Sequence, residues 1–221
     1  MCRIAGIDSE PFKIAAGVAL KHNLVIDEPT PESAGDTALP TPSTDARTHA
    51  LHRETKETNI RLELNLDGSG NVKVETGIGF LDHMLTALAF HSGIDLELIC
   101  QGDLHVDDHH TAEDCAIALG VAIDAALGPR KGIKRFGYAY APLDEALART
   151  VIDLSGRPWP EVNLHLERPM IGTWACENIT HFFQSLAMTL KCSLHVDVLR
   201  GTNDHHRAEA VQVLAKATEE R

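Results

Sequence analysis

One arrangement of histidine and glutamate occurs twice in the chain. A double histidine followed by a glutamate stands in "DDHHTAED" in the first half and in "NDHHRAEA" in the second half. A further histidine precedes each motif: His83 and His181 are 98 residues apart, against 96 for His109 and His205. Because a difference of two residues is an ordinary loop insertion, the sequence predicts two tandem copies of one structural unit.

Each copy is predicted to be a β-β-α-β-α unit, and the two copies together account for residues 59–218. In the first copy, apolar and polar residues alternate from Ile60 to Leu66, the chain turns at residues 67–70, and the alternation resumes at Val72. This pattern is typical of a β-hairpin with one solvated face.

The remaining elements follow from apolar periodicity and from glycine or proline at their ends. In the first copy, the helix "FLDHMLTALAFHS" is expected to end at Gly93, "IDLELIC" to form a strand, and "DDHHTAEDCAIALGVAIDAAL" to form a helix that ends at Gly128. The second copy offers the strands "RFGYAYA", "ARTVIDL" and "EVNLHL", the helix "ACENITHFFQSLAMTL", the strand "SLHVDVL" and the helix "DHHRAEAVQVLAKAT". The chain is therefore expected to be an α+β protein.

Composition excludes several classes of protein. A net charge of −12 over 221 residues argues against sequence-independent binding of nucleic acid, which needs a basic face. The longest apolar run, "CAIALGVAIDAAL", is too short to span a bilayer, so no membrane segment is predicted. The five cysteines form no C-x-x-C pair, which favours a reducing compartment over a disulfide framework. We expect a cytoplasmic protein.

Residues 1–45 differ in character from the rest. The stretch "DEPTPESAGDTALPTPSTDA" is rich in proline, serine, threonine and acids, which predicts a disordered or loosely attached tail. Its acids and its few basic residues argue against a transit peptide, and it has no clean secretory pattern. Residues 46–221 are expected to form one domain, with the repeats at about 53–130 and 131–221.

The two repeated motifs have the spacing of metal ligands. Residues i and i+4 share a helix face, so His109 with Glu113, and His205 with Glu209, each present an imidazole and a carboxylate together. The second histidine of each pair points about 100° away and can serve a different metal. With the upstream histidines, the candidate ligands are His83, His109, His110, Glu113, His181, His205, His206 and Glu209. Imidazole and carboxylate without thiolate favour Mn, Fe, Co, Ni or Zn.

Other polar residues are less specific by themselves. A lone double histidine more often marks a solvated or capping site, and only its repetition favours metal binding. The aspartates just upstream of the motifs could cap the helices or orient imidazoles. Isolated arginines such as Arg135 and Arg157 are usually solvated charges, and Glu57 has no role that its neighbours reveal. His91 follows His83 two turns later on a similar helix face.

Seven stretches occur together and in order: "RETKET", "GIGFLDHML", "DDHHTAEDCAIALG", "KRFG", "PLDEALAR", "DLSGRP" and "NDHHRAEA". They resemble the imidazoleglycerol-phosphate dehydratases, the dehydratases of histidine biosynthesis. The resemblance runs from about Arg53 to Glu209 and is nearer to fungal-type members than to bacterial ones. It implies a carbon–oxygen lyase that removes water from imidazole glycerol phosphate, a small phosphate ester, to give imidazole acetol phosphate.

The resemblance also implies a fold, a cofactor and an assembly. The expected fold has two similar halves with helices packed between two four-stranded sheets, as in ribosomal protein S5 domain 2-like folds. The expected cofactor is Mn(II), with two ions per active site. The expected partners are copies of the same chain, in trimers that assemble into a 24-subunit shell with active sites at subunit interfaces.

Individual roles follow from the same resemblance. The eight metal ligands carry over unchanged, Arg135 and Arg157 match positions that hold the substrate phosphate, and Glu57 is a candidate acid or base. The residues expected to act in catalysis are Glu57, His83, Glu113 and Glu209. The residues expected to contact the substrate are Glu57, His83, His91, His109, Glu113, Arg135, Arg157 and His205.

The C-terminal region departs from the family pattern. After "HHRAEA" the family continues with an aromatic residue and a phosphate-binding lysine, where this chain has Gln212 and Val213, and the family's later Ser-Thr-Lys segment is absent before Arg221. This departure predicts weakened substrate binding with intact metal ligands. Two alternatives stay open: an assembly-competent homologue of weak activity, whose ligands lock the oligomer, and a dinuclear metal phosphoesterase.

Overall fold

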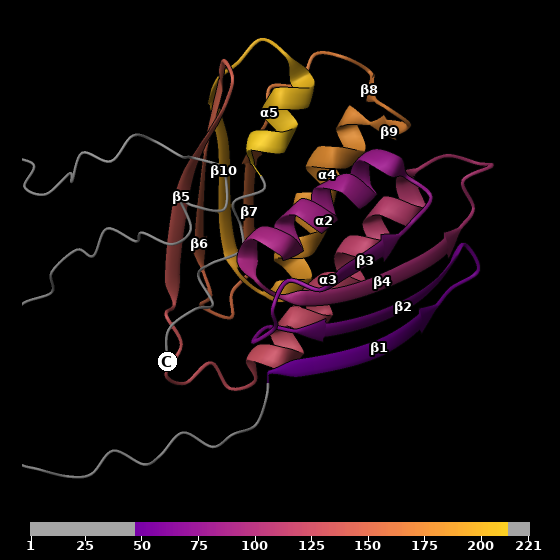
Figure 1. The fold of residues 1–221 in the computed structure, drawn as a ribbon, viewed down its shortest axis with the longest axis vertical. Coiled ribbons are helices and arrows are strands. Elements are labelled where there is room, and N and C mark those ends of the chain that lie inside the picture. The colour runs from indigo at the N-terminus through magenta and orange to yellow at the C-terminus, as the bar shows by residue number, and fades with distance from the viewer. Residues whose placement is uncertain (1–46, 212–221) are drawn as a thin grey trace, which may run out of the picture.

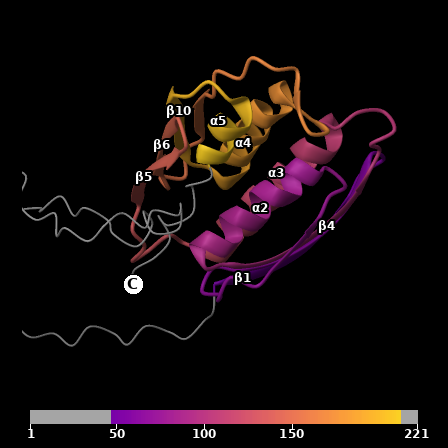
Figure 2. The ribbon, with the colours of Figure 1, turned by 45° about the horizontal axis from the view of Figure 1, so that its top comes forward.

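The computed structural model of the protein describes residues 47–211, which form two four-stranded β-sheets with helices between them (Figures 1 and 2). The predicted α+β class and the layer arrangement are confirmed. The tail expected at residues 1–45, and Gln212 and Val213 at the other end, lie outside the described residues.

The first sheet is built from β1 (Thr48–Glu54), β2 (Thr58–Asn65), β3 (Val72–Glu75) and β4 (Asp95–Gly102). Its strand order is β1-β2-β4-β3, in which β2 pairs antiparallel with β1 and β4, and β3 pairs parallel with β4. Alternate residues of β2 and β4 are buried, as a sheet with one covered face requires.

The second sheet repeats this arrangement with β5 (Phe136–Leu143), β6 (Ala146–Asp153), β7 (Trp159–Asn163) and β10 (Ser193–Arg200). Its order is β5-β6-β10-β7, again with one parallel pair, β7 beside β10. The short β8 and β9 strands, both within residues 170–175, pair with each other ahead of the next helix. The two halves therefore share one topology, in which three strands of the four-stranded sheet precede the first helix of each half.

The expected hairpin between residues 60–66 and the strand at Val72 is wrong. β2 does not pair with β3, because β4 lies between them in the sheet. β4 contributes Leu96 and Leu98 to the core at no more than 1% exposure, whereas β3 has only half-buried valines and stays at the edge. The true hairpin partner of β2 is β1, which the sequence did not reveal because that edge strand has no fully buried residue.

Four helices lie between the sheets in the described part of the chain: α2 (Gly79–Ser92), α3 (His109–Leu127), α4 (Cys176–Leu190) and α5 (Asp204–Ala210). α2 ends as predicted at Gly93, whose φ of 70° is in the left-handed region that terminates helices. α3 ends as predicted at Gly128. No helix within residues 47–211 has the length and hydropathy needed to cross a membrane.

α3 packs closely against α4, and this contact fixes the geometry of the site. The α3 face that includes Ala112, Ala116 and Gly120 is made of small residues four apart, and both alanines are buried. A Cβ at Gly120 would lie 2.1 Å from Thr189 Oγ1 and 2.9 Å from the Leu186 carbonyl oxygen, both on α4. Glycine is therefore required here for the two helices to approach, and their approach brings α4 side chains to α3.

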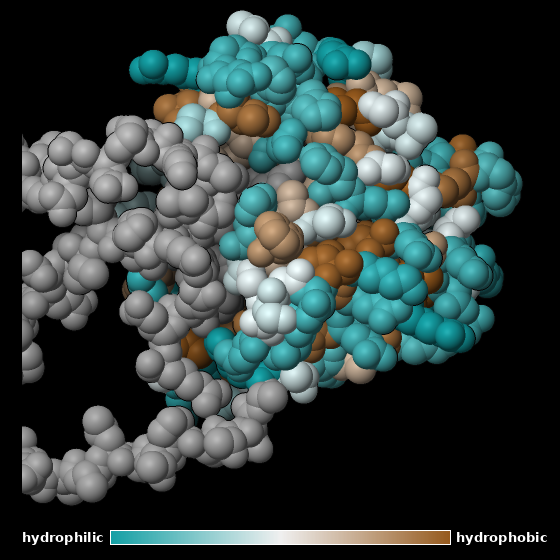
Figure 3. Space-filling view, viewed as in Figure 1, coloured by the Kyte–Doolittle hydropathy of each residue, from teal (hydrophilic) through white to brown (hydrophobic). Residues whose placement is uncertain are grey.

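One hydrophobic core connects both halves, because its buried residues come from both sheets and from all four helices. On the face shown in Figure 3, hydrophilic residues predominate and hydrophobic residues reach the surface only in separate groups. The candidate ligands of both halves are polar residues of the four helices.

Candidate metal centre and active site

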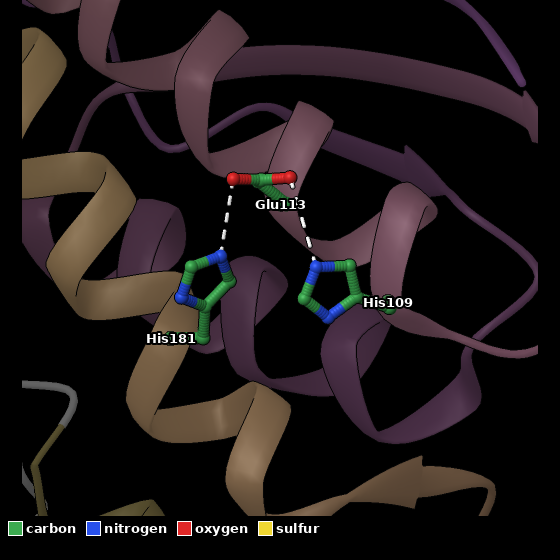
Figure 4. A group of neighbouring side chains, drawn as sticks. All are labelled: His109, Glu113 and His181. Atoms are coloured by element: carbon green, nitrogen blue, oxygen red, sulfur yellow. Dashed lines mark hydrogen bonds and ion pairs between the residues drawn. The ribbon is translucent and has the colours of Figure 1, made fainter.

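The first cluster of candidate ligands consists of His109, Glu113 and His181. The Glu113 carboxylate lies between the two imidazoles, with Oε1 3.1 Å from His181 Nε2 and Oε2 3.8 Å from His109 Nε2 (Figure 4). One candidate ligand atom from each residue lies within 4.8 Å of the others. Two imidazoles and a carboxylate at this spacing can hold one divalent cation and leave positions open for other ligands.

Asn178, one turn before His181 on α4, also lies beside the first cluster. Its Oδ1 lies 2.9 Å from His109 Nδ1, and the imidazoles of His109 and His181 stack with centroids 5.0 Å apart and planes at 17°. An amide oxygen at Nδ1 favours the tautomer that keeps Nε2 unprotonated toward Glu113.

The second cluster consists of His83, His205 and Glu209. Glu209 Oε1 lies 3.3 Å from His83 Nε2, and Glu209 Oε2 lies 3.1 Å from His205 Nε2. The Phe80 ring packs on His205 with centroids 4.9 Å apart. As in the first cluster, one carboxylate bridges two imidazoles.

Each cluster combines residues from both halves of the chain. In the first cluster, His109 and Glu113 come from α3 and His181 comes from α4. In the second cluster, His205 and Glu209 come from α5 and His83 comes from α2. A lone repeat could therefore supply only part of either cluster.

The second histidine of each motif lies outside the two clusters, and its ring forms a hydrogen bond with a carboxylate. His110 Nδ1 lies 2.9 Å from Asp103 Oδ2, and His206 Nδ1 lies 2.7 Å from Glu145 Oε2. The hydrogen bond to Asp103 raises the pKa of His110, and the hydrogen bond to Glu145 raises the pKa of His206. With Nδ1 engaged in this way, each ring keeps Nε2 as its candidate ligand atom for a different metal.

Glu57 and Glu145 occupy equivalent places, because each directly precedes the second strand of its hairpin. The charge of Glu57 contributes to the raised pKa of His110, so the carboxylate lies near that ring. Glu145 Oε1 accepts the backbone N–H groups of Thr202 at 3.0 Å and of Asn203 at 2.8 Å. Bonded to the His206 ring and to these N–H groups, Glu145 has a pKa far below its ordinary value. Glu57, by contrast, has no side-chain hydrogen bond within residues 47–211.

Of the aspartates upstream of the motifs, one has an expected role and two do not. Asp107 accepts the backbone N–H of His109 at 2.9 Å, which fits the predicted capping role. Asp108 instead accepts the N–H of Ala175 at 2.7 Å, at the start of α4. Neither Asp108 nor Asp204 contacts an imidazole within the described residues. The expectation that these two aspartates orient imidazoles is therefore wrong.

Asp204 is 2% exposed and holds a loop of the second half in place. Its Oδ2 accepts the N–H groups of Glu167 at 2.8 Å and of Arg168 at 2.6 Å, while Oδ1 pairs with Arg207 Nη1 at 2.9 Å. Burial would raise the pKa of Asp204, but these donors bring it below its ordinary value. Both aspartates thus fix backbone near the clusters.

Arg135 forms an ion pair with Asp153, and the charge of Arg157 acts on the same carboxylate. Asp153, at the end of β6, accepts Arg135 Nε at 2.6 Å and Nη2 at 2.9 Å. This pair lowers the pKa of Asp153, and the charge of Arg157 lowers it further. No contact within residues 47–211 joins either arginine to the histidine clusters.

Comparison with known proteins decides the family. A family model described as imidazoleglycerol-phosphate dehydratase matches residues 76–218. The chain belongs to the imidazoleglycerol-phosphate dehydratase family. The predicted family and the enzyme class, a hydro-lyase, are confirmed.

Relatives in this family are similar over most of the described chain. The imidazoleglycerol-phosphate dehydratase of Candida glabrata is 54% identical over 189 residues, which cover 77% of this chain and 90% of that protein. The Phytophthora nicotianae protein of the same name is 62% identical over 160 residues, but this chain spans only 35% of its length. The crystal structure of the Staphylococcus aureus enzyme superposes with a TM-score of 0.69 at 34% identity and covers 77% of this chain and 96% of that one.

Three of the residues expected from the dehydratase family lie apart from the clusters in a single chain, and Arg135, paired with Asp153, is one of them. His91 lies in the last turn of α2, where its ring contacts Phe90 with centroids 5.4 Å apart. Arg157 lies in the loop after β6. Their roles in substrate binding therefore stay predictions.

Three residues near the clusters were missed from the sequence: Asn178, Asp103 and Glu145. The stretch "PLDEALAR" carries Glu145 and could have revealed it, since it matches "RETKET" in position before the second strand of a hairpin. Asn178 and Asp103 had no comparable signal, because neither is repeated in the other half.

Proposed function

We propose that this chain catalyses the dehydration of imidazole glycerol phosphate to imidazole acetol phosphate in histidine biosynthesis, with two Mn(II) ions per active site. The observation that carries the proposal is the pair of clusters in which one carboxylate lies between two imidazoles. The names of the similar proteins support the same activity.

The donor set fits the proposed metal. Imidazole nitrogens and carboxylate oxygens without a thiolate suit a borderline or hard divalent cation such as Mn(II). His109, Glu113 and His181 would hold one ion, and His83, His205 and Glu209 the other. Bound Mn(II) would act as a Lewis acid toward the imidazole nitrogens of the substrate.

The chain's own groups supply proton transfer. Dehydration removes a proton from one carbon and a hydroxyl from its neighbour, and the two leave as water. Glu57 is exposed at the tip of the β1–β2 hairpin, with its charge close to His110. A carboxylate without a competing hydrogen bond can accept the proton and return it to the departing hydroxyl.

Arg135 and Arg157 would bind the substrate phosphate. Arg135 donates to Asp153, so a phosphate would compete with that carboxylate for the Arg135 donors, and the charge of Arg157 would add to the attraction. Guanidinium groups form paired hydrogen bonds with phosphate oxygens, which makes such an exchange favourable. The departures at Gln212 and Val213 would weaken phosphate binding without changing the metal ligands.

Assembly would bring the metals and the remaining ligands together. His110 and His206 are turned away from the two clusters and held at Nδ1 by carboxylates, so each could present Nε2 to an ion held by another copy. This geometry supports the proposed trimers and 24-subunit shell. We place the enzyme in the cytoplasm, where histidine biosynthesis would supply its substrate.

Turnover of imidazole glycerol phosphate tests the proposal. The full chain, stripped of metal and then supplied with Mn(II), should form imidazole acetol phosphate, detected as its ketone, and should lose this activity on chelation. Release of inorganic phosphate would instead support the phosphoesterase alternative. Growth of a large particle on addition of Mn(II), without turnover, would support a weakly active homologue.

A further inference from the structure

The two clusters differ at one equivalent position. The 98-residue offset that aligns His83 with His181 also aligns Phe80 with Asn178. Both residues lie one turn before the histidine of their helix, and both contact the imidazole that the other half of the chain contributes. The repeat thus places a hydrogen-bonding amide beside one cluster and an apolar ring beside the other.

In the first cluster the amide fixes the imidazole of His109. Asn178 is 6% exposed, and its Oδ1 lies 2.9 Å from His109 Nδ1. The bond requires a proton on Nδ1, so the lone pair of Nε2 stays free, and it also restricts rotation of the ring. Stacking on His181 at 17° between planes holds the ring from the other side.

In the second cluster the imidazole of His205 has no such hydrogen bond. Phe80 packs on the ring with planes at 50°, and no acceptor for His205 Nδ1 lies within residues 47–211. Phenylalanine leaves both tautomers available, and one of them carries its proton on the nitrogen that faces Glu209. His83 is also more exposed, at 51% of its side chain against 35% for His181.

We propose that Asn178 is a positioning residue that makes the first cluster bind its divalent cation more tightly than the second. The inference rests on the proposed metal centre and goes beyond it, because it assigns unequal affinities to two sites that the repeat alone would make equal. The compactness of the first cluster, whose ligand atoms lie within 4.8 Å of one another, agrees with this assignment. One ion would then stay resident while the other exchanges.

Titration of the metal-stripped full chain with Mn(II) tests the proposal, with free Mn(II) measured by electron paramagnetic resonance. The unmodified chain should show two classes of site, one tighter than the other. Glu113→Gln should remove the tighter class and Glu209→Gln the weaker class, which assigns each class to its cluster.

Variants at the equivalent positions Asn178 and Phe80 distinguish the effect of the hydrogen bond on Mn(II) binding from an effect of packing. Asn178→Leu should weaken the tighter class about 10-fold or more, as is usual when a hydrogen-bond partner of a ligating histidine is lost. Asn178→Asp keeps an acceptor oxygen and should restore tight binding. Phe80→Leu is the matched control, and it should leave the tighter class unchanged because it alters only the second cluster.

The outcomes distinguish this inference from the proposed function. Two classes of equal affinity, or an Asn178→Leu chain with unchanged Mn(II) binding, would overturn the role of Asn178 and leave the metal centre intact. The absence of any Mn(II) binding by the unmodified chain would overturn the metal centre itself. Equal weakening in Asn178→Leu and Asn178→Asp would show a packing effect and would also contradict the proposal.

Discussion

Glu113 on α3 lies 3.1 Å from His181 on α4, although the two residues belong to different halves of the chain. In the second cluster, Glu209 of the second half lies 3.3 Å from His83 of the first half. Each repeat therefore completes the cluster of the other. The close approach of α4 to α3, which Gly120 permits, brings His181 to Glu113 in the first cluster.

Glu57→Gln should abolish most of the activity without loss of metal. Removal of a general base typically lowers the rate by about 10²-fold to 10⁴-fold, because the proton then has no positioned acceptor. The value of kcat should fall by this amount, while the Mn(II) content stays the same. Glu54→Gln, at the exposed end of β1 in the same hairpin, is the matched control and should behave like the unmodified chain. Equal activity in both variants would exclude Glu57 as the base.

Arg157→Gln should raise KM more than it lowers kcat. Hydrogen bonds to a charged group contribute about 1.5–3 kcal/mol, so loss of this guanidinium should weaken phosphate binding about 10-fold to 100-fold. Steady-state kinetics with imidazole glycerol phosphate measures the effect. Arg61→Gln, on the exposed side of β2, is the control for a general change in charge. An unchanged KM for Arg157→Gln would remove this residue from the phosphate site.

Glu145→Gln should lower the pKa of His206 in the metal-free chain. Because the folded-state pKa of His206 is raised by Glu145, the ion pair stabilises the fold fully below the unfolded pKa of about 6.5, and this contribution disappears as the pH rises through the folded pKa. The stability difference between the two chains should therefore be larger at pH 5.5 than at pH 8.5. Denaturant unfolding at both pH values, with nuclear magnetic resonance titration of the imidazole, measures both effects. A pH-independent difference would contradict the ion pair.

Asp204→Ala should destabilise the fold strongly. The substitution removes the buried carboxylate partner of Arg207, which keeps only the exposed carboxylate of Glu167, and it removes the acceptor for two backbone N–H groups. Loss of one partner of a buried pair costs about 3–5 kcal/mol. Urea unfolding of the metal-free chain should show this loss. Lys73→Ala breaks an exposed pair with Glu97 and should change the free energy of unfolding far less, because solvent screens that pair. Similar values for the two variants would contradict a structural role for Asp204.

Repetition is what made the site predictable from the sequence. Two copies of one motif marked the candidate ligands, and the helical i+4 spacing correctly placed His109 with Glu113 and His205 with Glu209. The pairing of each cluster with a histidine from the other half was not predictable. It depends on how α3 lies against α4 and how α2 lies against α5, which no local pattern encodes.

Strand pairing and supporting contacts were harder to predict. The alternation around Ile60 identified β2, but strand neighbours are chosen by burial across the whole sheet, so β4 displaced β3 from the expected hairpin. Glu145 acts through a hydrogen bond with His206, which lies 61 residues away in the sequence. Contacts of that kind leave no periodic signal.

The most direct test of the metal centre is a crystal structure of the Mn(II)-loaded chain, with anomalous scattering measured at the manganese edge. Two anomalous peaks per chain are predicted, one among His109, Glu113 and His181 and the other among His83, His205 and Glu209. The absence of a peak at either cluster, or strong peaks elsewhere, would contradict the account.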